Sequence, residues 1–253
     1  KQQILRRLQL LFHHGYVVRP RCQLDYYHTE GSKTIIYGIA RKGANLISEQ
    51  DENPELDWTL KNTSIKRLYL QHSIMTSDVL VQMELAFRGH EHLKFLPEEQ
   101  LHLGRNKFSW KCIKLGGKSQ TVIPDAVFAI DENRQSGATK RCYFFVEADT
   151  GSMPITRHSK SSRTCYKQKL EMYWQSWKQG VLREKHGIHR FLMLTVTHSA
   201  SRAKLIAQAA NTQHPSSGIF RFTDLPSLQS SAQGNHTLQH PWLNCQSSPT
   251  SLW

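Results

Sequence analysis

The chain has 253 residues, of which 38% are hydrophobic, and it carries a formal net charge of +13 at pH 7. This length suits one large domain or a main domain with a small companion, and the charge favours a polyanionic partner, either nucleic acid or an anionic membrane surface. No run of 18 apolar residues and no signal-peptide pattern occurs, and the five cysteines are scattered without a CxxC pair, so we expect no membrane span, no structural zinc site and reduced thiols in a cytoplasm.

The first fifty residues predict a small unit of helices and a hairpin. Apolar residues at helical spacing predict a helix over residues 3–16, which Gly15 ends. Two strand-like segments, residues 16–22 and 34–40, flank a polar turn, and residues 41–50 begin another helical pattern. Helix, strand, turn and strand is the order of the last part of a winged helix-turn-helix, whose wing is the β-hairpin. A small α+β packing element with no DNA role is the alternative.

The same unit holds eight Lys and Arg residues against three acids, which agrees with DNA binding. Its candidate contacts to a DNA backbone are Arg6, Arg7, Arg19, Arg21, Lys33, Arg41 and Lys42.

A polar linker over residues 51–67 and a larger domain over residues 68–225 are predicted next. The domain begins with a helix that runs from Leu68 to a stop at Gly89, with Glu84 among its apolar positions. Strand-like and helical patterns then alternate: strands within 92–103, 107–115, 121–131 and 141–149, a helix at 162–180, a strand at 189–197, a helix at 199–212 and a last strand at 218–225. This order predicts an α/β domain, a sheet with helices on its faces. Residues 226–253, rich in Ser, Gln, His and Asn, predict a loosely ordered tail.

Three acids attract attention because they follow or begin buried strand patterns. Glu147 and Asp149 end the apolar run YFFVEAD (143–149), and residues i and i+2 of a strand point to the same face. Asp125 lies in the preceding strand pattern, next to Pro124, and an antiparallel hairpin would bring it near Glu147. Clustered carboxylates repel unless a cation lies between them or one is protonated, and hard cations such as Mg²⁺ or Mn²⁺ prefer oxygen ligands. Solvated acids at strand ends are the alternative.

A basic segment follows these acids. Lys169 lies between Tyr166 and Tyr173 at helical spacing, so it can lean over the sheet edge, where a lysine could orient metal-bound water and stabilise charge on a phosphate. Further basic residues of this segment could hold the DNA backbone: Arg157, Lys160, Arg163 and Lys167.

The segments VIPDAVFAID (122–131), YFFVEADTGSM (143–153), YKQKLEMYWQSW (166–177) and RFLMLTVT (190–197) resemble the plasmid replication-relaxation family. The resemblance covers most of residues 1–225 and includes the segment YGIARKGANL (37–46). It implies a winged-helix domain, here partial, followed by a mixed sheet like that of PD-(D/E)xK nucleases and restriction endonucleases, flanked by helices.

The resemblance also implies roles for individual residues. Asp125 takes the place of the first motif acid and Glu147 that of the second, while Asp149 stands where the motif usually has lysine, a role that Lys169 can fill from the helix. Glu84 resembles an accessory acid of some members. The tyrosines at positions 26, 27, 143, 166 and 173 offer no clear covalent nucleophile, and the last three fit core positions better.

The implied function is nicking or relaxation of double-stranded DNA at the origin of a plasmid or mobile element, in the bacterial cytoplasm, with Mg²⁺ or Mn²⁺ and with no membrane partner. Relaxases of mobilisable plasmids resemble this family. Two alternatives stay open. One is a DNA-binding replication or transfer factor without catalytic activity, favoured by Asp149 where lysine is usual. The other is a nuclease-like domain that acts only within an assembly such as a relaxosome.

Overall fold

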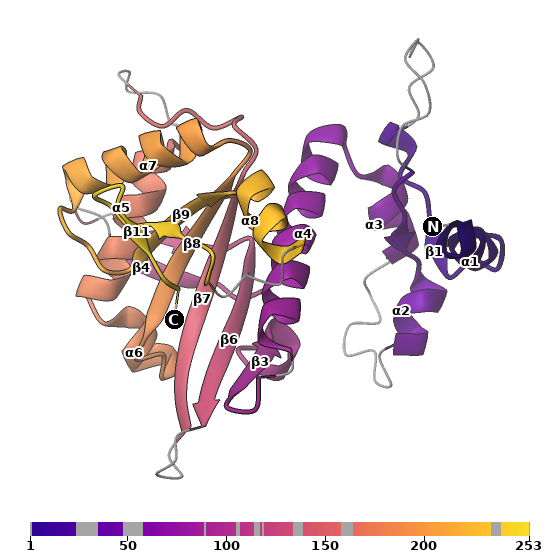
Figure 1. Ribbon diagram of the computed structural model, residues 1–253, viewed down its shortest axis with the longest axis horizontal. Helices are drawn as coiled ribbons and strands as arrows, with labels where there is room; N and C mark the ends of the chain where they lie inside the picture. Colours follow the sequence, from indigo (N-terminus) through magenta and orange to yellow (C-terminus); the bar gives the residue numbers. More distant parts are fainter. Residues whose placement is uncertain are drawn as a thin grey trace. The chain divides into compact units, whose positions relative to one another are not determined.

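The computed structural model divides into an N-terminal unit, residues 1–71, and a C-terminal unit, residues 72–253, coloured along the sequence in Figure 1. The structure describes residues 2–23, 35–47, 58–88, 90–104, 107–113, 117, 119–133, 139–157, 164–233 and 239–252. None of the helices in these ranges has the length and apolar character needed to cross a bilayer.

The N-terminal unit contains the predicted helix and paired strands. Its elements are α1 (Gln2–His13), β1 (Val17–Val18), the 3-10 turn η1 (Arg21–Gln23), β2 (Gly38–Ile39), α2 (Arg41–Ile47) and α3 (Trp58–Ser64). Gly15 adopts φ +75° after α1, where its N–H donates to the Phe12 carbonyl and the next N–H, of Tyr16, donates to the Leu11 carbonyl. This is the glycine-dependent end that the sequence predicts for the helix. The strands β1 and β2 pair antiparallel.

Helix α3 corrects the prediction of a polar linker over residues 51–67. Asn62 Nδ2 donates to the Ile39 carbonyl at 2.7 Å, and Thr59 Oγ1 accepts the N–H of Arg41 at 3.1 Å. The polar side chains that suggested a linker therefore satisfy backbone groups of β2 and α2. Gly43 is also required here, because a Cβ on it would lie 2.2 Å from the Tyr16 carbonyl oxygen.

The C-terminal unit is built on a mixed seven-stranded sheet in the order β11-β10-β9-β8-β7-β6-β3. Strands β7, β8 and β9 are parallel, and the remaining neighbours are antiparallel. The strands are β3 (Leu93–Pro97), β6 (Ala126–Asn133), β7 (Thr139–Asp149), β8 (Phe191–Thr197), β9 (Phe220–Asp224), β10 (Trp242–Leu243) and β11 (Pro249–Thr250). The predicted α/β class and the buried central position of the 141–149 strand are confirmed.

Helices cover both faces of this sheet (Figure 1). On one face lie α5 (Tyr166–Lys178), α6 (Val181–His186) and α7 (Ala200–Gln213), and on the other lie α4 (Arg67–Phe87) and α8 (Leu225–Gln233). A hydrophobic core lies on each face of the sheet, and alternating side chains of β7 contribute to both. Phe145 packs in the core on the α5 side and Phe144 in the core on the α4 side, and both are fully buried. The odd-numbered residues of β7 therefore face α5 and α7.

Pro124 divides the segment that the sequence predicts as one strand. Residues 119–122 form β5 (Ser119–Val122), which pairs with β4 (Trp110–Ile113) in a separate two-stranded sheet, whereas β6 begins at Ala126. Proline has no N–H to donate to a strand ladder, which explains why the two strands are interrupted at Pro124. The small sheet packs on α5 through a 2.7 Å hydrogen bond from Trp110 Nε1 to Ser176 Oγ.

The predicted loosely ordered tail is also corrected for its described residues. Residues 225–233 form α8, and β10 and β11 extend the sheet beyond β9. Trp242 is fully buried in the core on the α4 side, and Leu252 joins the same core. Two apolar side chains thus fix a polar segment whose composition alone indicates disorder.

Candidate functional site

The register of β6 and β7 brings Asp125 beside Glu147. Ala126 pairs with Val146, the Asp125 N–H donates to the Val146 carbonyl at 3.0 Å, and Asp125 Oδ2 accepts the Ala148 N–H at 2.9 Å. The hairpin geometry expected from the sequence is therefore present, and it holds two acids at the same end of the sheet.

Glu147 is 1% exposed and faces α5. Its Oε2 accepts a hydrogen bond from Lys169 Nζ at 2.5 Å, and its Oε1 accepts one from the Tyr173 hydroxyl at 2.6 Å. Lys169 and Tyr173 are four residues apart on α5, so they lie one turn apart on the same face of the helix. The lysine that the sequence places on this helix thus reaches the motif acid.

The buried pair has shifted protonation equilibria. Burial, and to a smaller extent the Asp125 carboxylate, raise the pKa of Glu147 to about 7 against the charge of Lys169 and the hydrogen bonds from Lys169 and Tyr173. Burial alone would lower the pKa of Lys169, but the carboxylates of Glu147 and Asp125 outweigh burial and raise it. A protonated lysine therefore contacts Glu147, and its charge also favours the ionised form of the neighbouring Asp125.

His72 completes the surroundings of Asp125 and was missed by the sequence reasoning. Its Nε2 lies 3.0 Å from Asp125 Oδ2. Burial of Asp125 disfavours its charged form, but the hydrogen bond from His72, the charges of Lys169 and His72, and the Ala148 N–H together lower its pKa. The same hydrogen bond raises the pKa of His72 against the effect of burial. The available signal was spacing, since His72 lies three residues before Met75 and seven before Val79, both on the buried stripe of α4.

Asp149 is occupied by a different partner. Arg202, near the start of α7, donates from Nε and Nη2 to the two carboxylate oxygens of Asp149, and Nη2 also donates to the Met153 carbonyl at 2.6 Å. Asp149 is 3% exposed in its side chain. It therefore anchors the segment after β7 to α7, and no carboxylate oxygen of Asp149 is left without a partner.

The oxygen atoms at this sheet end fit a hard cation only in part. Asp125 and Glu147 are adjacent carboxylates of the type that Mg²⁺ and Mn²⁺ prefer, whereas Asp149 is engaged by a guanidinium. Within the described ranges, no group of three or more His, Cys, Asp and Glu side chains is arranged to hold a metal ion. The three acids expected to share one site are thus divided into an Asp125–Glu147 pair and a separate Asp149–Arg202 pair.

Glu84 lies away from these acids. It is exposed on α4 and forms an ion pair with Arg88 at 2.6 Å. It follows His72 by twelve residues, which is about 18 Å along a helix. The structure does not bring it to the Asp125–Glu147 pair.

The tyrosines expected in the core are there. Tyr166 and Tyr173 are buried, and their hydroxyls donate to Thr195 Oγ1 and Glu147. Burial raises both hydroxyl pKa values well above 10. Tyr143 is 8% exposed. Tyr26 and Tyr27 lie outside the described residues.

The candidate DNA contacts of the N-terminal unit differ in their surroundings. Arg6, Arg7 and Arg21 are exposed, as is Arg41. Two others contact their own unit: Arg19 lies 4.3 Å over the Phe12 ring and donates to the Tyr37 hydroxyl, and Lys42 donates to the His14 carbonyl and lies over the Tyr16 ring. In the C-terminal unit, Arg157 and Lys167 are half-buried. Lys33, Lys160 and Arg163 fall outside the described residues.

Comparisons with known proteins place the chain in a family. No curated protein and no solved structure gave a significant match. A family model described as replication-relaxation matches residues 1–192, which include α1, the sheet from β3 to β7 and the whole of α5. Membership indicates a role in the replication or mobilisation of plasmid DNA, and hence an interaction with DNA. The chain therefore belongs to the replication-relaxation family.

Proposed function

We propose that this protein nicks double-stranded DNA at a plasmid or mobile-element origin by metal-dependent cleavage of a phosphodiester bond. The single observation that carries the proposal is the contact of Lys169 with Glu147 beside Asp125. Two carboxylates and a lysine at one end of a central β-hairpin are the groups that such cleavage uses. In this proposal the C-terminal unit is a PD-(D/E)xK nuclease-like domain and the N-terminal unit is a partial winged helix that binds DNA.

Asp125 and Glu147 would hold Mg²⁺ or Mn²⁺, which supplies a Lewis acid for the phosphate and lowers the pKa of bound water. Lys169 keeps its positive charge beside Glu147 because the two carboxylates raise its pKa. It is therefore able to stabilise negative charge that develops on a scissile phosphate. Tyr173 fixes the direction of the Glu147 carboxylate through the 2.6 Å hydrogen bond to Oε1.

His72 and Asp149 have positioning roles in this proposal. His72 orients Asp125 from α4, as an outer partner orients a ligating carboxylate. Asp149 fixes Arg202, which also donates to the Met153 carbonyl just after β7. This contact would help α5 to present Lys169 and Tyr173 to Glu147. Exposed arginines of the N-terminal unit would contact the DNA backbone, among them Arg6, Arg7 and Arg21.

The proposal is tested with the purified full chain on supercoiled plasmid that carries its origin, with Mg²⁺ or Mn²⁺ and with EDTA. We expect open-circular product only with a metal, and a loss of at least about a hundredfold in rate for Glu147→Gln and for Asp125→Asn. Glu99→Gln is the matched control, because Glu99 is exposed and distant in sequence from the site. Nicking by Glu147→Gln at the wild-type rate would refute the assignment.

A second function is favoured by a different observation. Each of the three acids is already next to a cationic or protonatable side chain: Asp125 by His72, Glu147 by Lys169 and Asp149 by Arg202. Ion pairs of this kind can be structural, and the protein would then be a replication or transfer factor that binds DNA without cutting it. Tight, salt-sensitive binding to origin DNA with no cleavage under any metal distinguishes it. Cleavage that appears only after mobilisation proteins are added would indicate that the protein works within a relaxosome.

A further inference from the structure

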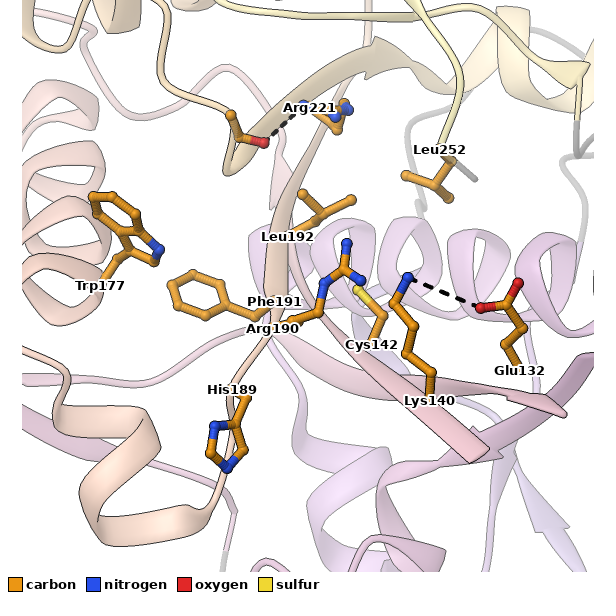
Figure 2. A pocket seen from close by; sticks show the side chains of 11 residues that line it. Glu132, Lys140, Cys142, Trp177, His189, Arg190, Phe191, Leu192, Arg221 and Leu252 are labelled. Atoms are coloured by element: carbon orange, nitrogen blue, oxygen red, sulfur yellow. Dashed lines mark hydrogen bonds and ion pairs between the residues drawn. The ribbon is translucent and has the colours of Figure 1, made fainter. Parts of the chain in front are cut away.

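A second candidate site lies at the other end of β7. A cleft of about 410 Å³ is lined by residues near the starts of β7 and β8, among them Cys142 and Arg190 (Figure 2). Cys142 precedes Glu147 by five residues, a distance of about 16 Å along an extended strand. Alternation also points Cys142 toward the opposite face from Glu147. The cleft is therefore separate from the Asp125–Glu147 pair.

The lining of the cleft is mainly cationic. Lys140, Arg190 and Arg221 line it, against one carboxylate among the lining residues, that of Glu132. Lys140 Nζ lies 3.9 Å from Glu132, the contact drawn as a dashed line in Figure 2. The acid is thus matched by the lysine, and the two guanidinium groups supply an excess of positive charge.

Arg221 has no carboxylate partner among the residues that the structure describes. Its Nη1 donates to the carbonyls of Gly218 and Phe220 at 3.0 and 2.9 Å, but its Nε is buried with no hydrogen-bond partner among the described residues. Burial lowers the pKa of this guanidinium, with only the Cys245 and Cys142 thiols acting in the opposite direction. A half-buried cation without a carboxylate is less favourable than one whose charge an anion offsets.

The cleft also offers an aromatic surface. Trp177 lines it and is 50% exposed, with its ring centroid 4.9 Å from that of Trp174. Figure 2 shows Trp177 on the opposite side of the cleft from Leu252, with the guanidinium groups between them. Cys142 adds no negative charge, because burial raises the pKa of its thiol to about 11.

We propose that this cleft binds a nucleotide, with its phosphate held by Arg190 and Arg221 and its base stacked on Trp177. Arginine suits phosphate because its planar fork can donate two parallel hydrogen bonds, and exposed aromatic rings stack on bases of any sequence. The volume lies within the range of about 300–1,000 Å³ that is usual for small-ligand sites. The nucleotide is either free or part of a DNA single strand, since both present the same phosphate and base.

Binding is measured with the full chain in EDTA, so that it does not depend on cleavage at the Asp125–Glu147 pair. The probes are dAMP, by calorimetry, and a short fluorescent single-stranded DNA, by anisotropy. We expect Arg190→Glu and Trp177→Leu each to weaken binding about tenfold or more. Arg183→Glu is the control of equal charge change, because Arg183 is exposed on α6 and does not line the cleft.

The pattern of losses identifies the occupant. Weakened binding of dAMP supports a site for a free nucleotide, and weakened binding of the oligonucleotide alone supports a site for a DNA strand. Equal losses in Arg190→Glu and Arg183→Glu, or no loss in either cleft variant, would overturn the proposal. Because Arg190 and Trp177 are exposed, circular dichroism is expected to show the wild-type fold for both variants. A failed nicking assay leaves this measurement unaffected.

Discussion

The two ends of β7 carry opposite arrangements of charge. At its C-terminal end, Glu147 and Asp149 are buried acids, and each has a basic partner on a helix of the same face: Lys169 on α5 and Arg202 on α7. At its N-terminal end, Arg190 and Arg221 line the cleft, and the one carboxylate among its described lining residues, that of Glu132, already lies 3.9 Å from Lys140. The acids at one end thus have basic partners within the described residues, whereas the cleft at the other end keeps an excess of positive charge.

The comparison shows why pairing alone does not identify a functional site. A buried ion pair contributes little net stability, because desolvation of both charges offsets their attraction. What matters is how each end responds when one charge is removed. The acidic end should lose either activity or stability, depending on the acid, whereas the basic end should lose ligand binding and little else.

The largest expected effect is on cleavage at the acidic end. Lys169→Met removes the charge beside Glu147, and we expect the nicking rate to fall by about a hundredfold to a thousandfold while DNA binding stays the same. Rates on supercoiled plasmid and affinities by anisotropy give the two values. Lys178→Met, on the exposed last turn of α5, is the control. Equal rates for the two variants would show that Lys169 has no catalytic role.

The next effect is on stability and separates Asp149 from Glu147. Arg202→Met leaves the Asp149 carboxylate buried without its guanidinium, and we expect the free energy of unfolding to fall by about 3 kcal/mol. Adding Asp149→Asn removes the unpaired charge and should recover most of this loss. Urea denaturation of the single and double variants measures it. If Asp149 is a positioning residue, the double variant still nicks DNA; if it is a metal ligand, the double variant is inactive.

His72 should have a smaller and pH-dependent effect. His72→Gln removes the partner of Asp125, and we expect nicking to fall about tenfold. Because the pKa of His72 is raised in the folded state, its contribution to stability is complete below its ordinary value of 6.5 and is lost as the pH rises through the folded value. The melting temperature of the variant should therefore be further below that of wild type at pH 5.5 than at pH 9. His90→Gln, exposed after α4, is the control. A difference that grows with pH would contradict this account.

The smallest effect is expected at the basic end. Arg221→Met exchanges a half-buried guanidinium for an apolar side chain. Because no carboxylate in the described part of the chain pairs with Arg221, we expect the free energy of unfolding to change by less than about 1 kcal/mol. The same substitution at Arg202 is the comparison, measured in the same urea titration. A loss at Arg221 as large as that at Arg202 would show that the two ends are not different in kind.

Much of the acidic end follows from local periodicity. The strand alternation of YFFVEAD and the helical position of Lys169 between two tyrosines were sufficient to predict that Glu147, Asp125 and Lys169 lie together. The partners of Asp125 and Asp149 could not be predicted this way. His72 and Arg202 each lie 53 residues from the acid they contact, and only the packing of α4 and α7 against the sheet brings them close.

Composition was the weaker guide. The polar residues of 58–64 suggested a linker, yet Asn62 donates to the backbone of β2. The polar residues of the tail suggested disorder, yet Trp242 is buried in the core. A single buried tryptophan outweighs many polar neighbours, because it removes a large apolar area from water. Whether a polar segment packs back in this way depends on where the edge of the sheet lies, and the spacing of apolar residues in the sequence does not reveal that edge.

The parallel pairing of β7 with β8 limits where this protein can be shortened. The family match ends at Leu192, the second residue of β8. A fragment cut there keeps the acids of β7 but loses Thr195, which lies beside Glu147 in register, and Arg202, which binds Asp149. It also loses β9, which pairs with β8, and α7, which packs in the core on the α5 side of the sheet. We therefore expect a fragment that ends with the family match to be less stable than one that extends through α7 and β9.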